Sequence, residues 1–329
     1  MQKRQLGLFS VSAIGLGCMN LSHAYGTPPD AKIAGDVLLK ALDLGYTHFD
    51  TAALYGFGAN ETLLGNVLKI RSGEFMLASK CGMFRDAEGK REIDARPHVL
   101  KKTCEDSLKR LQTDVIDLYY LHRWQKTIPI EESIGALADL VREGKIKAIG
   151  LSEVSADTLM KAHRVHPIAA LQTEYSLWTR NAEIAVLAAC KKIGAAFVAF
   201  SPIARGFLGG ELRDVTVLPP KDIRLPMPRF QGENFAKNLK LLDGFSKLAR
   251  ENDCTMAQLS LAWLLAQGDH VIPIPGTTRI DHLAENAAAP DVRLSTETLA
   301  RLDALINPNT VSGLRYPAAV QAEIDTEGA

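Results

Sequence analysis

Residues 115–152 read VIDLYYLHRWQKTIPIEESIGALADLVREGKIKAIGLS, and they contain one complete strand, helix and strand unit. Val115 to His122 and Lys147 to Ser152 are apolar runs of about strand length. Between them, apolar residues recur at the spacing of one helix face. Gly144 follows the helical pattern, at a place where a residue that tolerates positive φ ends a helix. The stretch therefore predicts two neighbouring parallel strands that a helix connects.

Apolar runs of this kind alternate with amphipathic stretches along the whole chain. The eight runs are Ala13 to Met19, Thr47 to Ala52, Phe75 to Lys80, Val115 to His122, Lys147 to Ser152, Ala169 to Tyr175, Ala196 to Pro202 and Val271 to Pro275. Such alternation builds a parallel sheet covered by helices. The predicted fold class is α/β, a (β/α)8 TIM barrel that spans residues 1–329 as a single domain.

Three segments lie outside this alternation. Arg4 to Ser12 is expected to form a short N-terminal β-hairpin that closes the floor of the barrel. Arg205 to Asn238 is rich in glycine, proline and charge, and long stretches of this kind are usually functional or mobile. We predict that it forms a loop over the carboxyl-terminal mouth. The residues after Pro317 are expected to be loosely held.

Charge and cysteine content narrow the classes of function. The 38 basic and 38 acidic residues form no long block of one sign, so we expect neither a nucleic-acid partner nor attraction to a membrane surface. No stretch offers the ~18 apolar residues of a spanning helix. The five cysteines form no CxxC pair and are odd in number, which indicates separate packing thiols in a reducing compartment. A cytoplasmic protein is expected; the oligomeric state stays open.

Polar residues end three of the apolar runs. The second run reaches Asp50 and continues to Tyr55, the third ends at Lys80, and the fourth ends at His122. Reactive groups in a (β/α)8 barrel lie at the carboxyl ends of the strands, so these four side chains should converge on one mouth. A single strand-end Tyr or His is more often structural. Together the four favour catalysis over a purely structural ion-pair network, because buried polar groups are costly.

These residue types suit the reduction of a carbonyl group. A carbonyl that accepts hydride becomes an alkoxide and needs a proton donor close to its oxygen. The phenol of Tyr55 is a weak acid, with an ordinary pKa of about 10. We expect the Lys80 ammonium to lower the pKa of Tyr55, Asp50 to compensate the buried ammonium, and His122 to orient the carbonyl.

The segments THFDTAALYG, LASK, DLYYLHR and IPIPGTTR resemble the aldo-keto reductase family in order and spacing, and the resemblance extends from Gln5 to Leu305. It implies hydride transfer from NADPH to an aldehyde or ketone, with the four strand-end residues as a catalytic tetrad and Tyr55 as the general acid. The stretches SHAYG, LHRW and EYSLW are similar to bacterial and plant reductases of varied aldehydes, ketones or pyridoxal. The family binds its dinucleotide without a Rossmann fold, and here Gly15-Leu16-Gly17 does not extend to GxGxxG.

The resemblance also implies cofactor contacts, one position at a time. Ser152 and Gln172 match positions that hold the nicotinamide carboxamide, and Phe200 matches a ring that stacks on the nicotinamide. The other implied contacts are Ser201, Pro202, Ile203 and Arg205 in the loop after the seventh run, Gly276, Thr277, Thr278 and Arg279 around the 2′-phosphate, and Glu285 and Asn286 at the adenine. Arginine suits a doubly charged phosphate. Core packing of Phe200 and a solvated Arg279 are the competing interpretations.

Two positions depart from the pattern of many relatives. Glu153 stands where Asn is common, and its role is left open. His282 stands where a second basic residue is common, which makes the expected preference for NADPH over NADH less absolute.

The residues of the substrate pocket are expected just beyond the strand ends. The candidates are Met19, Tyr25, Phe57, Met83 and Trp124. Their side chains favour an apolar or aromatic carbonyl compound.

Two other functions compete with carbonyl reduction. A regulatory or redox-sensing subunit of a larger assembly, similar to a channel β subunit, would use the same barrel and dinucleotide. A metal-dependent hydrolase on this barrel would need paired histidines or carboxylates at strand ends, and the sequence has neither HxH nor HExxH. No metal site is therefore predicted.

Overall fold

The computed structural model describes residues 1–85 and 91–328, and within them eight parallel strands form one curved sheet. In order, the strands are β3 (Leu16–Gly17), β4 (His48–Asp50), β5 (Met76–Cys81), β8 (Ile116–Leu121), β9 (Ile146–Ser152), β10 (Ile168–Glu174), β11 (Ala196–Phe200) and β12 (Val271–Pro273). Each pairs in parallel with its neighbour in this order. Every strand overlaps one predicted run, and the predicted (β/α)8 fold is confirmed.

The first and last strands meet and close the sheet into a barrel. The amide of Gly15 donates to the carbonyl of Pro273 at 3.0 Å, and the amide of Gly17 donates to that of Pro275 at 3.2 Å. A Cβ at Gly17 would lie 2.8 Å from the carbonyl oxygen of Ile274. Glycine is therefore required where the two ends of the sheet approach each other.

A hairpin of β1 (Lys3–Leu6) and β2 (Phe9–Ser12) lies where the sequence predicted it. Leu6 and Val11 are buried and belong to the same apolar cluster as Leu118 and Tyr120 inside the barrel. The hairpin therefore fills the floor of the barrel, as expected.

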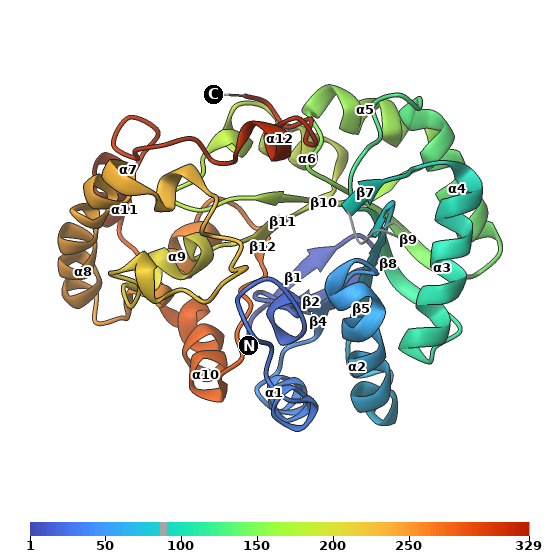
Figure 1. Cartoon of the computed structure of the whole chain (residues 1–329), viewed down its shortest axis with the longest axis horizontal. Coiled ribbons are helices and arrows are strands. Elements are labelled where there is room, and N and C mark those ends of the chain that lie inside the picture. The colour runs from blue at the N-terminus through green and yellow to red at the C-terminus, as the bar shows by residue number, and fades with distance from the viewer. Residues whose placement is uncertain (86–90, 329) are drawn as a thin grey trace.

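Helices surround the strands on the outside (Figure 1). They are α1 (Ala31–Asp43), α2 (Ala59–Leu68), α3 (Pro97–Leu111), α4 (Ile130–Arg142), α5 (Ala156–Val165), α6 (Val186–Ile193), α7 (Gly232–Leu239), α8 (Leu241–Glu251), α9 (Met256–Leu265), α10 (Ile280–Ala288) and α11 (Thr296–Leu305). Successive side chains of a strand point alternately into the barrel and outward to the helices. Tyr119 and Leu121 of β8 point outward and pack in the large core beneath the helices. No helix in the described part is long and apolar enough to cross a membrane.

Some predicted loops have more structure than expected. α7 occupies the last part of the stretch predicted as a loop, where Phe235 is buried. After β5, the strands β6 (Met83–Arg85) and β7 (Arg91–Ile93) pair in antiparallel fashion. The sequence did not predict these two strands.

The expectation of a loosely held end after Pro317 is wrong. That end includes α12 (Ala318–Gln321), and the segment that carries it runs close to α5 and α6 (Figure 1). The carboxylate of Asp325 accepts bonds from the Ser155 amide (3.1 Å) and the Thr158 hydroxyl (2.7 Å). An acidic side chain at the N-terminus of α5 is also favoured by the helix dipole.

Two helix glycines provide a matched test of the packing. A Cβ at Gly65 in α2 would lie 2.3 Å from the backbone carbonyl oxygen of Arg110, whereas one at Gly135 in α4 would meet nothing within 4 Å. We predict that Gly65→Ala lowers the free energy of unfolding by about 2 kcal/mol or more, because α2 and α3 must separate. Gly135→Ala should raise it by about 0.5–1 kcal/mol. Urea unfolding of both variants checks this, and a Gly65→Ala protein as stable as the wild type would contradict it.

Candidate active site

The four strand-end residues meet at the carboxyl end of the barrel. Asp50 ends β4, Lys80 lies in β5, His122 follows β8, and Tyr55 stands in the turn after β4. The fully buried ammonium of Lys80 forms an ion pair with Asp50 and donates to the hydroxyl of Tyr55 at 3.3 Å. The rings of Tyr55 and His122 lie edge to face, with centroids 5.9 Å apart. The sequence therefore identified side chains that the fold brings together.

The electrostatics of the group differ in one respect from the expectation. Burial raises the pKa of Tyr55 and outweighs the neighbouring Lys80 ammonium, which lowers it, so the pKa lies above its ordinary value. The expected net lowering is not found, because the phenol is almost completely shielded from water. Burial also disfavours the ammonium of Lys80, yet Asp50 and Tyr55 prevail and raise its pKa. At neutral pH the phenol is thus protonated and the amine is charged.

His122 is held in its neutral form. Burial, followed by the charges of Arg123 and Lys80, keeps its pKa well below the ordinary value. A neutral imidazole at this place can donate one hydrogen bond through its ring N–H.

A cavity of about 650 Å³ opens beside these residues, within the usual range for ligand sites. Asp50, Tyr55 and His122 line the cavity. Lys80 is not a lining residue, but its ammonium donates to the hydroxyl of Tyr55. Every residue predicted to bind the cofactor also lines it: Ser152, Gln172, Phe200, Ser201, Pro202, Ile203, Arg205, Gly276, Thr277, Thr278, Arg279, Glu285 and Asn286. These residues stand within or after four neighbouring strands, β9 to β12, so the predicted cofactor wall is one continuous side of the cavity.

Several of these side chains already have protein partners. The amide of Gln172 donates to Asp50 at 2.7 Å, which connects the predicted cofactor wall to the catalytic group. Arg205 donates to Glu174 at 2.7 Å. Arg279 is mostly exposed and is paired with Asp281. By contrast, the buried Oδ1 atom of Asn286 has no hydrogen-bond partner in the described residues.

The predicted substrate residues divide into two groups. Met19, Tyr25 and Met83 line the cavity. Phe57 is 46% exposed, with the guanidinium of Arg85 at 3.9 Å from its ring centre, and it is not a lining residue. Trp124 is not one either; its indole N–H donates to the carbonyl of Ile128 at 2.8 Å.

Sequence reasoning missed other lining residues. They are Asn20, His23, Arg91, Arg123, Arg224, Tyr316, Pro317 and Val320, among others. Arg123 could have been found, because it directly follows His122 at the end of β8. Tyr316, Pro317 and Val320 carry no such signal, because they come from a segment that follows the last helix of the barrel.

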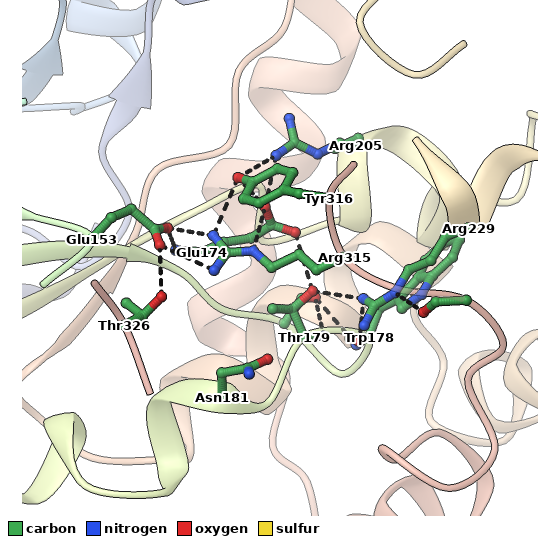
Figure 2. Close-up of polar contacts among 12 residues, drawn as sticks. Glu153, Glu174, Trp178, Thr179, Asn181, Arg205, Arg229, Arg315, Tyr316 and Thr326 are labelled. Carbon is green, nitrogen blue, oxygen red and sulfur yellow. Dashed lines mark hydrogen bonds and ion pairs between the residues drawn. The ribbon is translucent and has the colours of Figure 1, made fainter. Parts of the chain in front are cut away.

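Glu153, whose role the sequence left open, anchors that segment (Figure 2). Its carboxylate binds the guanidinium of Arg315 through both oxygens and accepts from the Thr326 hydroxyl at 3.2 Å. It also accepts from the backbone amide of Glu174 at 3.0 Å. Glu153 has φ +57°, an uncommon conformation for a residue with a side chain, and these bonds hold it there. Its side chain does not line the cavity.

Glu174 is the junction of the same network (Figure 2). Its Oε2 atom accepts from Arg205 at 2.7 Å, from the hydroxyl of Tyr316 at 2.9 Å and from Arg315 at 3.2 Å. Although burial opposes its charge, Arg205, Arg315 and the third nearby cation, Arg229, hold its pKa well below the ordinary value. The network therefore connects the loop after β11 to Tyr316 in the wall of the cavity.

Comparisons with known proteins agree with this geometry. The family model "Aldo/keto reductase family" matches residues 13–307. A relative from Schizosaccharomyces pombe, "Aldo-keto reductase yakc [NADP(+)]", is 43% identical over 327 residues, covering 98% of this chain and 96% of its own. "Probable aldo-keto reductase 1" from Glycine max is 42% identical over 309 residues, covering 94% of this chain and 89% of its own.

Solved structures resemble the barrel over almost its whole length. The glycerol dehydrogenase AKR11B4 from Gluconobacter oxydans matches with a TM-score of 0.87 and 29% identity, covering 96% of this chain and 98% of its own. An aldo-keto reductase from Klebsiella pneumoniae in complex with NADPH matches with a TM-score of 0.73 and 28% identity, covering 96% of this chain and 99% of its own.

The network around Glu153 gives a prediction for stability. Arg315→Ala would leave two buried carboxylates short of a cation, so we expect the free energy of unfolding to fall by about 3–5 kcal/mol. Arg142→Ala is the control, because Arg142 is exposed on α4, and its stability should match the wild type. Urea unfolding measures both effects. Equal stability of the two variants would contradict the anchoring role of Arg315.

Proposed function

Because the chain belongs to the aldo/keto reductase family, we propose that it is an NADP(H)-dependent oxidoreductase that reduces an aldehyde or ketone to an alcohol. The observation that carries this proposal is the contact of the buried Lys80 ammonium with the Tyr55 hydroxyl, 3.3 Å apart, at the wall of a large cavity. The names of the Schizosaccharomyces pombe relative and the Klebsiella pneumoniae structure support NADP(H) as the cofactor.

The residues of the long cavity wall fit such a dinucleotide. Phe200 offers a ring for a flat heterocycle. Gly276 lines the cavity and has no room for a side chain, because a Cβ there would lie 2.8 Å from the carbonyl oxygen of Gly17, so only its backbone is available to a ligand. The unpartnered Oδ1 of Asn286 can accept an N–H of an adenine amine. Arg279 lies at the same end and can pair with a 2′-phosphate.

When bound, the nicotinamide supplies the hydride that reduces the carbonyl carbon. Tyr55 then gives its phenolic proton to the carbonyl oxygen, which would otherwise become an alkoxide. Lys80 stabilises the phenolate that remains, at a hydrogen-bond distance of 3.3 Å. Asp50 keeps the amine charged despite its burial.

His122 and Gln172 complete this arrangement as neutral hydrogen-bond donors. A neutral His122, which faces the ring of Tyr55, can donate to the carbonyl oxygen and orient it towards the phenol. Gln172 donates to the second oxygen of Asp50 at 2.7 Å and thereby fixes the carboxylate that holds Lys80.

Removal of the proposed acid gives the most direct test. Tyr55→Phe keeps the ring but deletes the proton, so we expect turnover of small aldehydes to fall by roughly 10³-fold or more. The affinity for NADPH, measured by its fluorescence, should change by less than about threefold. Turnover near the wild-type value would show that Tyr55 is not the acid.

Arg279 gives a test of cofactor preference. We predict that Arg279→Ala weakens NADPH binding by roughly tenfold or more and hardly changes NADH binding, because only NADPH has a 2′-phosphate. Asp281→Asn is the matched variant: it frees Arg279 from its present partner and should tighten NADPH binding. Dissociation constants of both cofactors from fluorescence titration check this. Equal weakening of NADPH and NADH by Arg279→Ala would contradict it.

A further inference from the structure

Among the described residues, positive charge exceeds negative charge at the end of the cavity beside Tyr55 and His122. Arg91 and Arg123 line the cavity together with Tyr55 and His122. Arg91 is paired with Glu323, whereas Arg123 has no carboxylate partner in residues 1–85 and 91–328. Of the lining carboxylates, Asp50 forms an ion pair with Lys80, and Glu211 and Glu285 are close enough to Arg279 to help raise its pKa, after its partner Asp281.

The guanidinium of Arg123 has hydrogen-bonding capacity left over. One of its terminal nitrogens donates to the carbonyl of His122 at 2.6 Å and to the hydroxyl of Ser152 at 3.1 Å, and both acceptors are neutral. Its buried Nε atom has no hydrogen-bond partner within the described chain. A guanidinium offers five N–H donors in a planar fork that matches a carboxylate. Among residues 1–85 and 91–328, Arg123 therefore has no anionic partner of the kind that its geometry favours.

Two histidines at this end respond to the same positive charge. After burial, Arg123 and Arg91 are among the causes that keep the pKa of His122 below its ordinary value. His23 also lines the cavity and stacks on Tyr55, with ring centroids 6.4 Å apart. Burial, Arg85 and Arg91 lower its pKa. Both imidazoles are thus uncharged at neutral pH, and the arginines remain the cations that an anion would meet.

Apolar side chains also line this end of the cavity. Met19, Leu54 and Met83 line the cavity close to Tyr55, and all three pack in or against one apolar cluster. Such a wall suits the carbon skeleton of a ligand, while Arg123 suits a charged group on it.

We propose that the substrates are carbonyl compounds that carry a carboxylate, and that Arg123 is the specificity-determining residue that binds it. This inference rests on the proposed function. Arg123 forms and breaks no covalent bond: the carbonyl carbon still receives hydride from NADPH, which becomes NADP⁺, and the oxygen still receives the proton of Tyr55. The carboxylate only fixes the compound in the cavity, with its carbonyl towards Tyr55 and His122.

The experiment compares 4-carboxybenzaldehyde with 4-methylbenzaldehyde, two aldehydes of similar size that differ in charge. The wild type should favour the carboxylate by roughly tenfold or more in kcat/KM, and salt should reduce this ratio. Arg123→Gln should reduce the ratio to about one, and Arg123→Lys should retain part of it, because lysine keeps the charge but loses the fork. Arg142→Gln on α4 is the control and should keep the wild-type ratio.

A binding measurement supports the kinetic one. Benzoate titrated calorimetrically into enzyme saturated with NADP⁺ should bind roughly tenfold more weakly to Arg123→Gln than to the wild type. This readout does not depend on turnover.

The possible outcomes separate the two proposals. A wild type that reduces both aldehydes equally well would overturn the carboxylate proposal and leave the reductase proposal intact. Equal losses for both aldehydes in Arg123→Gln, with weaker NADPH binding, would also overturn it and would place Arg123 at the cofactor. A wild type that reduces neither of these aldehydes nor any of a wider set would instead contradict the proposed function.

Discussion

The ion pair between Lys80 and Asp50 is the constraint on which the site depends. Both side chains are almost fully shielded from water, and burying either charge alone would cost several kcal/mol. The pair is possible because β4 and β5 are neighbours, with Asp50 opposite Ala78, so that Lys80, two residues farther along β5, lies on the same face as Asp50. The ammonium donates a further hydrogen bond to the backbone carbonyl of Thr51, at 2.8 Å. The ammonium also donates to the hydroxyl of Tyr55, so the pairing of β4 with β5 helps to set the position of the phenol.

A second set of buried charges holds the opposite wall of the cavity. Glu153 and Glu174 stand at the ends of β9 and β10, where a barrel exposes its strand ends, and they bind Arg315 from the C-terminal segment. Without that segment the two carboxylates would lose their shared cation, Arg315. The role of Glu153 is therefore to attach the chain end that supplies Tyr316, since the Glu153 side chain itself does not line the cavity.

The sequence predicted what depends on regular repetition and missed what depends on contacts between distant segments. The eight apolar runs and the strand-end positions of Asp50, Lys80 and His122 follow from local periodicity and from the geometry of a closed parallel sheet. Tyr316 could not be predicted, because its place depends on an ion pair across 162 residues between Glu153 and Arg315. Phe57 stands beyond a strand end as expected, yet a positive φ of +54° directs the chain so that its ring is largely exposed. The pKa of Tyr55 depended on the degree of burial, which a sequence does not specify.

The raised pKa of Tyr55 suits the chemistry better than the lowered one first expected. A phenol made acidic in the resting enzyme would lose its proton before the carbonyl needed it. In the proposed reaction, burial would keep the proton on the phenol until negative charge develops on the carbonyl oxygen, and Lys80 would then stabilise the charge that passes to the phenolate. The dry environment raises the pKa of Tyr55 and also makes the nearby Lys80 ammonium more effective, because charges interact more strongly where water is excluded. In the proposed reaction, burial would therefore supply both a protonated donor and a strong electrostatic field for the transition state.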